Sequence, residues 1–393
     1  MPYPAKDGGA IATLSLAKNL CRNGATVDIL AMNTSKHNTN YEDIPDEITH
    51  TIVISTVEIN TEINFFQALG NFFFSSLPYN ATRFISNDFQ KKLIELLQKN
   101  SYDIVQLEGV YLCPYIQCIR QYSKAKIALR AHNIEHEIWK RVAHHTLNPF
   151  KKLYLYNLSR RIRRFESQYL QRYDFLIPIT ARDGEKYQQM GSTVPQHIVS
   201  TGVDKDNALL QIDNRWVLFP SLFYIGALDW LPNQEGLKWF VKNVWDRFYK
   251  RYPATFTIAG RNAPASLIHY FNEHHINFIG EVDDSYKIFE HQSIMVVPIL
   301  SGSGMRIKII EGMAAGKAII TTSIGTEGID TTHEENILVA DTAKKFYQCL
   351  EQVYNDFHLY LQLSENARTF VTKHFDNEII AKNLINFYTN HLS

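Results

Sequence analysis

The chain has 393 residues, of which 45% are hydrophobic and 20% are charged, so it is long enough for two domains with buried cores. Its 40 basic residues balance 40 acidic residues, so the chain as a whole has no field that would attract nucleic acid or an anionic membrane. The four cysteines are scattered without a zinc-ligand spacing, so we expect no metal site and a reducing compartment.

We expect a cytoplasmic protein. No run of the sequence reaches the ~18 apolar residues that a transmembrane helix needs, and we expect no secretory signal. The most apolar run, residues 63–77, is short and interrupted by polar side chains. A helix that covers the core is the favoured interpretation of this run. The alternative is a surface that meets lipid or an apolar acceptor.

The N-terminal stretch predicts a glycine turn at residues 7–9, followed by a helix over residues 10–20 with apolar residues at helical spacing. In nucleotide-binding α/β folds, such a turn follows a buried strand and directs backbone N–H groups at a phosphate. Only six residues precede the turn, and two of them are prolines. We therefore expect that the first strand of this domain is missing and that the native start lies upstream of Met1.

Strands and helices alternate along the N-terminal half. Short apolar runs predict strands, and longer segments with apolar residues at helical spacing predict helices. The predicted strands are residues 27–31, 103–107, 127–131 and 175–179, and the predicted helices are residues 84–100 and 151–173. This alternation implies a parallel sheet with crossover helices.

A polar stretch over residues 191–217 interrupts the pattern, which then resumes. The later strands are predicted at residues 222–225, 254–258, 276–279, 294–298, 318–321 and 337–339, and the later helices at residues 234–250, 307–315, 343–355, 360–371 and 377–391. We therefore predict an α/β protein with two doubly wound domains. They span residues 1–199 and 218–375, with a linker over residues 200–217.

The densest functional signal is "PILSGSGMRIKIIEGMAAG" over residues 298–316. A strand ends there, a glycine-serine loop follows, and a helix begins near residue 307. The free N–H groups of the helix, together with Arg306 and Lys308, make an anion site. Glu311 lies one turn further and could accept two hydroxyl hydrogen bonds from a ribose. The alternative is an ordinary capped helix, but glycines, cations and a carboxylate coincide at one strand end.

This segment resembles the donor-binding domain of family 4 glycosyltransferases, as do residues 224–240, 257–261 and 278–284. Residues 2–9, 130–139 and 200–204 extend the resemblance to the N-terminal half, so it covers nearly the whole chain in the expected order. Family 4 enzymes have the GT-B fold, in which two Rossmann-like domains border an interdomain cleft. The resemblance implies this fold here, with residues 376–393 returning to the N-terminal domain as a helix.

The resemblance implies donor-binding roles in the C-terminal half. Glu311 corresponds to the second glutamate of the family's E-x7-E motif, which binds the donor ribose. Lys308 lies where related sequences direct a lysine at the diphosphate, and the loop of residues 301–304 would supply backbone N–H groups. The remaining donor-binding set in this segment is Gly302, Ser303, Gly304, Met305 and Arg306.

The resemblance also implies roles in the N-terminal half. Gly8 and Gly9 match a glycine loop that faces the donor phosphates from across the cleft. His132 matches a strand-end histidine near the transferred sugar, which makes it catalytic together with Lys308 and Glu311. As in the family, the reaction would retain the anomeric configuration and need no metal.

Two positions depart from the family pattern. Ser303 replaces the first glutamate of E-x7-E, and Ala227 replaces a phosphate-binding arginine that Arg261 or Arg306 could compensate. A subgroup of the family with similar segments shares both departures, so we do not interpret them as inactivation. They leave the identity of the sugar undetermined.

Residues near His132 have simpler interpretations. His132 itself could be a hydrogen-bonded loop residue, with Asn133 capping the next helix. Three neighbours, Glu135, His136 and Glu137, are expected on the surface of that helix. Asp7 is expected to cap the helix that follows it.

The basic run of Lys151, Lys152, Arg160, Arg161, Arg163 and Arg164 is expected to be the solvated face of a helix. The alternative is contact with anionic headgroups of a membrane or of a lipid-linked acceptor, at about 1 kcal/mol per charge. No nucleic-acid reading motif accompanies it, so nucleic acid is not an expected partner.

We therefore predict a glycosyltransferase that moves a sugar from a nucleoside-diphosphate sugar to a glycan or lipid-linked glycan. The product would be a cell-surface polysaccharide or lipopolysaccharide, and the enzyme would be cytoplasmic or peripheral at the inner face of a membrane. The alternatives are a glycosyltransferase-like binding subunit and, with a poorer fit to the motifs, a GT-B sugar-nucleotide epimerase.

Overall fold

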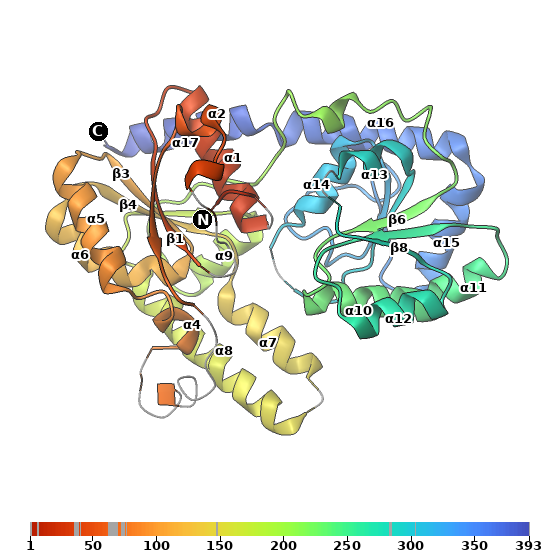
Figure 1. Cartoon of the computed structure of the whole chain (residues 1–393), viewed down its shortest axis with the longest axis horizontal. Helices are drawn as coiled ribbons and strands as arrows, with labels where there is room; N and C mark the ends of the chain where they lie inside the picture. Colours follow the sequence, from red (N-terminus) through yellow and green to blue (C-terminus); the bar gives the residue numbers. More distant parts are fainter. Residues whose placement is uncertain are drawn as a thin grey trace. The chain divides into compact units, whose positions relative to one another are not determined.

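In the computed structural model, the chain forms two compact units (Figure 1). Unit 1 comprises Met1–Thr201 and Asn377–Ser393, and unit 2 comprises Gly202–Asp376. The structure describes residues 2–5, 8–34, 39, 41–61, 70–71, 75, 77–146, 148–282, 285–302 and 304–392.

Unit 2 is a parallel sheet of strand order β11-β10-β9-β6-β7-β8 (Figure 1). The chain adds β7 and β8 on one side of β6 and then adds β9, β10 and β11 on the other side. The topological switch point therefore lies between β6 and β9, where doubly wound sheets bind ligands. The strands are β6 (Leu222–Ile225), β7 (Phe256–Ala259), β8 (Asn277–Gly280), β9 (Ile294–Val297), β10 (Ala318–Thr321) and β11 (Leu338–Val339).

Helices cover the sheet of unit 2 and bury its strands. Every residue of β7, β9 and β10 is buried, as is typical of parallel strands covered on both faces. The helices are α10 (Leu231–Phe240), α11 (Asp246–Tyr249), α12 (Ala265–Glu273), α13 (Tyr286–His291), α14 (Ile307–Ala314), α15 (Ala343–Asn355) and α16 (Phe357–His374), with a 3₁₀ helix at Ala208–Gln211.

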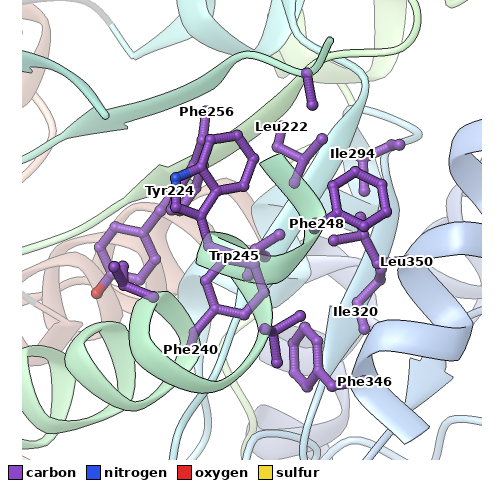
Figure 2. Close-up of a cluster of buried hydrophobic side chains, with 14 of the residues drawn as sticks. Leu222, Tyr224, Phe240, Trp245, Phe248, Phe256, Ile294, Ile320, Phe346 and Leu350 are labelled. Atoms are coloured by element: carbon purple, nitrogen blue, oxygen red, sulfur yellow. The ribbon is translucent and has the colours of Figure 1, made fainter. Parts of the chain in front are cut away.

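An aromatic cluster forms the main core of unit 2 (Figure 2). The sequence predicts one helix over residues 234–250, but a π-helical segment, Val241–Trp245, separates α10 from α11. Its wider turn keeps Phe240, Trp245 and Phe248 all fully buried. Figure 2 shows Trp245 near Phe256 of β7, and the rings of Phe240 and Trp245 both contact Phe256.

Residues 202–217, predicted as a linker, belong to unit 2 because polar contacts tie them to α14 and α16. The fully buried Lys317 donates through Nζ to Asn214 Oδ1 at 2.6 Å, and the Tyr360 hydroxyl donates to the same oxygen at 3.1 Å. Asn214 Nδ2 and the Arg368 guanidinium both donate to the Ala315 carbonyl oxygen. These contacts fix the C-terminal end of α14.

Unit 1 contains two parallel sheets. β1 (Asp28–Asn33) pairs with β2 (Val53–Glu58), and β3 (Ile104–Glu108), β4 (Lys126–Ala131) and β5 (Phe175–Pro178) pair in this order. Its helices are α1 (Gly8–Arg22), α2 (Asp46–Thr49), α4 (Tyr79–Thr82), α5 (Asn87–Lys99), α6 (Ile116–Tyr122), α7 (Glu135–His145), α8 (Pro149–Tyr169), α9 (Ala181–Gln189) and α17 (Asn377–Leu392), with 3₁₀ helices at Tyr41–Asp43 and Val110–Tyr115.

No described strand pairs with both β1 and β3, so the two sheets of unit 1 remain separate. Ile29, Leu30, Ile104 and Val105 on these two strands are only half-buried, whereas every residue of β5 is buried. If unit 1 followed the strand order of unit 2, one more strand would lie between β1 and β3. The sequence analysis expected a strand before the turn at residues 7–9, and this expectation stays a prediction.

The C-terminal helix α17 belongs to unit 1 and packs against α1 and the sheet of β3, β4 and β5. Ala381 and Leu384 are fully buried beside Phe175. Asn377 Nδ2 donates to Ser15 Oγ of α1 at 2.8 Å. The last residues of the chain therefore complete the core of its first unit.

Among the residues that the structure describes, no helix combines the length and the apolar character needed to span a bilayer. Residues 62–69, 72–74 and 76, which make up most of the apolar run noted in the sequence, lie outside the described residues. Both interpretations of that run stay predictions.

We expect Leu384→Ala to lower the free energy of unfolding of unit 1 by about 2–5 kcal/mol, because it leaves a cavity in a closed core. The control is Ile379→Ala on the same helix, since Ile379 is 48% exposed and should cost far less. Hydrogen exchange, followed peptide by peptide, measures the protection of unit 1 in the two variants. Equal protection of β4 and β5 in the two variants would contradict this role of α17.

Candidate functional site

The candidate site of unit 2 lies at the carboxyl ends of β6 and β9. Gly226 follows β6, and the loop of residues 298–306 joins β9 to α14. A Cβ atom at Gly236 of α10 would overlap the Pro298 carbonyl oxygen. A glycine there lets α10 approach the start of the loop, which fixes the loop beside the switch point.

Lys308, on the first turn of α14, reaches across to β6. Its Nζ donates to the Tyr224 hydroxyl at 2.7 Å and to Asn233 Oδ1 at 3.3 Å, and it lies 4.4 Å from the centroid of the Tyr224 ring. A Cβ atom at Gly226 would overlap this ammonium group, so the glycine makes room for it. Two of the three ammonium donors are thus occupied, and one remains for a ligand. Burial, followed by repulsion from Arg306, lowers the pKa of Lys308 to about 7.

The glycine loop encloses Arg306. Its Nη1 donates to the Gly304 carbonyl oxygen at 2.6 Å. Gly302 has φ of 109°, and a Cβ atom there would lie 3.0 Å from Arg306 Nη2. Met305 is half-buried against the core beneath α14. The structure therefore gathers Gly302, Gly304, Met305 and Arg306 beside Lys308, while Ser303 lies outside the described residues.

Glu311 lies one turn after Lys308 on α14. Its carboxylate accepts no hydrogen bond from any residue in the described part of the chain, so its oxygens are available to a ligand. Burial raises the pKa of Glu311 to about 7, and the charge of Lys308 opposes that rise. The site thus combines a cation and a carboxylate that both titrate near neutrality.

Arg261 lies at the same edge of the sheet, directly after β7 and Gly260. Its carbonyl oxygen accepts the Leu228 N–H at 2.9 Å, so the loops after β6 and β7 are tied together. A carboxylate that the sequence analysis missed also reaches this edge. Glu235 of α10 accepts a hydrogen bond from Ser301 Oγ at 3.2 Å. As the second residue of the helix predicted over residues 234–250, it gave no signal.

A second polar cluster lies at the carboxyl ends of β3 and β4 in unit 1. His132 Nε2 lies 2.7 Å from Glu108 Oε2. Thr13 Oγ1 of α1 donates to the same oxygen at 3.1 Å, and Gln106 Nε2 donates to Glu108 Oε1 at 2.5 Å. The buried Arg130 places Nη1 3.5 Å from Glu108 Oε2 and donates to the Ala12 carbonyl oxygen at 3.0 Å.

Glu108 is the centre of this cluster, and the sequence analysis did not select it. Burial alone would raise its pKa, but Arg130, His132 and Gln106 outweigh burial and lower it to about 2. Glu108 is therefore ionised at neutral pH and fixes the ring of His132. The sequence signal was its place at the end of a predicted strand, before Gly109 with φ of 107°.

Gly8 and Gly9 are the first residues of α1, which carries Ala12 and Thr13 to the cluster around Glu108. Their N–H groups have no intrahelical acceptor, as at any helix start. Asp7, the expected cap of this helix, lies outside the described residues.

The first turn of α7 differs from the prediction. Glu135 and His136 are half-buried, because the buried Glu166 of α8 accepts the N–H of Glu135 at 2.9 Å and lies 2.5 Å from His136 Nδ1. Burial and the charge of Glu166 raise the pKa of Glu135 to about 7. Asn133 is not the cap, since Ile134 occupies that position and Glu166 supplies the acceptor instead.

The basic run of α8 is not one uniform face. Arg161 is half-buried and donates through Nη2 to the carbonyl oxygens of Ser75 and Leu77, both at 2.7 Å. It therefore supports the fold instead of facing solvent. Near the start of α8, Phe150 is 84% exposed and Leu153 is 71% exposed.

Comparison with known proteins places unit 2 in a family. Residues 219–356 match the family described as glycosyl transferases group 1. Over 390 residues, the chain is 24% identical to an uncharacterised 44.6 kDa protein in the cps region of Klebsiella pneumoniae, with 96% of this chain and 95% of that protein covered.

Solved structures share the fold of the whole chain. A sucrose-phosphate synthase from Thermosynechococcus elongatus has a TM-score of 0.70 at 17% identity, covering 98% of this chain and 93% of that one. HepE of Anabaena, in complex with UDP and glucose, has a TM-score of 0.64 at 12% identity, covering 98% and 96%. A glycosyltransferase from Rickettsia africae has a TM-score of 0.67 at 15% identity, covering 98% and 96%. The chain therefore shares the GT-B fold of these structures, and residues 219–356 within unit 2 match the glycosyl transferases group 1 domain.

Proposed function

We propose that the enzyme transfers a sugar from a nucleoside-diphosphate sugar to a glycan acceptor, with retention of configuration and without a metal cofactor. The observation that carries this proposal is the arrangement of Lys308, Arg306 and Glu311 around the glycine loop at the switch point of unit 2. The presence of UDP and glucose in the similar HepE structure supports a nucleoside diphosphate ligand. Retention and metal independence rest on the family resemblance alone.

The donor diphosphate would bind the third donor of Lys308, the Arg306 guanidinium and backbone N–H groups at the start of α14. Glu311 would accept hydrogen bonds from the ribose hydroxyls. As the bond from the sugar to the diphosphate breaks, negative charge grows on the departing phosphate. Cations and N–H groups already fixed in place stabilise that charge without reorganising, which is usually the largest catalytic effect.

His132 is proposed to act on the transferred sugar from unit 1. Because Glu108 binds Nε2, the other ring nitrogen, Nδ1, is the one left for the substrate. The ionised Glu108 would also stabilise a positive charge on the ring. Glu108 is therefore a positioning residue, whereas His132 touches the substrate. Gly8 and Gly9 are proposed to face the donor phosphates, as the family resemblance implies.

The acceptor is proposed to be a growing cell-surface polysaccharide or lipopolysaccharide, free or lipid-linked. The similar Klebsiella pneumoniae protein is described as lying in a cps region, which supports a polysaccharide. We propose a cytoplasmic enzyme with peripheral membrane contact near the start of α8. The exposed Phe150 and Leu153 beside Lys151 and Lys152 support that contact.

Lys308→Ala and Glu311→Ala should each lower donor affinity or transfer rate by roughly ten- to hundred-fold, because each removes a hydrogen bond to or from a charged group worth ~1.5–3 kcal/mol. The matched control is Lys344→Ala, since Lys344 is also the second residue of a helix in unit 2. A panel of nucleotide sugars, screened by thermal shift, supplies the donor for the assay.

Full activity in both variants would contradict the site. Donor binding without transfer or donor hydrolysis in the wild-type protein would instead favour a binding subunit.

Donor affinity should be highest near pH 7. Above pH 7 the free protein loses the Lys308 proton, and below pH 7 it protonates Glu311, since both pKa values are about 7. Diphosphate raises the pKa of Lys308, so binding should take up a proton at pH 8, with affinity falling by up to about tenfold per pH unit. Calorimetry of UDP binding in buffers of different ionisation enthalpy measures this uptake. Lys308→Met should abolish it, and uptake that persists in that variant would assign it to another group.

Glu108→Gln should destabilise unit 1 by about 3–5 kcal/mol, because it leaves Arg130 buried without its carboxylate. Combining it with Arg130→Met should recover much of that stability. Transfer activity should remain low in the double variant, since His132 still lacks its charged partner. Thermal unfolding tests the predicted change in stability, and the rate of transfer tests the predicted change in activity. A double variant with wild-type activity would show that Glu108 acts only on the fold.

A further inference from the structure

A pocket of about 590 Å³ lies between α7 and α8 in unit 1. Figure 1 shows the two helices as an antiparallel pair. Ser159 of α8 donates through Oγ to the His136 carbonyl oxygen at 2.8 Å, which holds the helices together at one place. Tyr156 forms part of the wall, and Arg182 of α9 also lines the pocket. This volume is that of an ordinary ligand pocket.

The lining of this pocket is strongly basic. It includes Lys140, Arg141, Arg160, Arg163 and Arg182, whereas its only carboxylate from the described residues belongs to Glu137. Glu137 accepts a hydrogen bond from Arg182 at 2.5 Å and lies 3.6 Å from Arg141 Nη2. The carboxylate of Glu137 therefore interacts with two of the five cations.

The other three cations have no such partner. Lys140, Arg160 and Arg163 form no hydrogen bond or ion pair with any residue in the described ranges. Charged side chains on a single helix face are ordinarily solvated, but these cations come from two helices and converge on one concavity. Their mutual repulsion is relieved when an anion binds between them. The position is thus suited to a multiply charged ligand.

The donor set indicates which anion. Guanidinium groups bind phosphate through two parallel N–H donors, and a lysine adds a point charge. His136 adds a fixed ring, because Glu166 holds its Nδ1 at 2.5 Å and leaves Nε2 for a ligand. Two guanidinium groups and one ammonium group, with that ring nitrogen, match a phosphodiester or diphosphate better than a single carboxylate.

We propose that the α7–α8 pocket binds a phosphate-bearing part of the acceptor. This inference rests on the proposed function and deepens it, because α7 begins only three residues after His132 and its first turn lines the pocket. An acceptor held there by its phosphate would extend its neutral sugars toward the carboxyl end of β4. The phosphate would be either part of the glycan or the diphosphate of a lipid carrier.

The test measures binding of inorganic pyrophosphate by calorimetry, with every protein carrying Lys308→Met so that the site of unit 2 contributes equally. Arg160→Ala/Arg163→Ala should weaken pyrophosphate binding by roughly ten- to hundred-fold. Added salt should also weaken pyrophosphate binding to the protein with an unchanged pocket. The control is Arg164→Ala, since Arg164 is an exposed neighbour on α8 that does not line the pocket. It should change the affinity by less than about twofold.

Absence of pyrophosphate binding, or equal affinity in the pocket and control variants, would overturn the inference. Binding of UDP to the protein without Lys308→Met is measured separately, so failure of the donor site is distinguishable. Co-sedimentation with phosphatidylcholine vesicles that carry a polyprenyl diphosphate identifies the source of the phosphate. Sedimentation that needs Arg160 and Arg163 indicates a lipid carrier. Pocket-dependent pyrophosphate binding without sedimentation indicates a phosphate within the glycan.

Discussion

The hydrogen bond from Lys308 Nζ to the Tyr224 hydroxyl is the contact on which the proposed donor site depends. It joins α14 to β6 across the switch point, and Gly226, which has no side chain, leaves room for the ammonium group. Burial raises the pKa of Tyr224, so its hydroxyl stays neutral and only accepts this hydrogen bond. An ammonium group with neutral partners beside Arg306 carries an electrostatic cost that an anion removes. A negative ligand bound beside Lys308 and Arg306 would offset that cost.

In unit 1, the strand-end cations are compensated by a carboxylate of the protein itself. Its strand-end cations, Arg130 and His132, share the carboxylate of Glu108, which is ionised even in acid. That cluster is internally neutralised and needs no ligand anion. The contrast explains why we place the diphosphate in unit 2 and assign a positioning task to Glu108. The arginines of α8 differ in the same way. Arg161 binds carbonyl oxygens of the protein, whereas Arg160 and Arg163 line the pocket without such a partner among the described residues.

The sequence predicted well those features that depend on residues close together in the chain. Most strands of the two units and the loop around Gly302 and Gly304 were predictable, because apolar runs, glycines and charges follow one another within a few residues. The sequence analysis missed β2 (Val53–Glu58). Contacts between distant segments were not predictable. Tyr224 and Asn233 lie more than 70 residues before Lys308, and Glu166 lies 30 residues after His136. The contacts of the predicted linker were also not predictable, since polar residues such as Asn214 bind buried groups that only the folded chain supplies.

The packing of α17 on unit 1 has a consequence for how the protein is made. A ribosome synthesises unit 2 in full before it adds the helix that closes the core of unit 1. Domains ordinarily fold from the N-terminus as they emerge, but here the first unit to emerge is the last to be finished. Until then Phe175 and its apolar neighbours lack the residues that cover them. A nascent chain that stops before residue 377 would therefore contain all of unit 2 but only an incomplete core of unit 1.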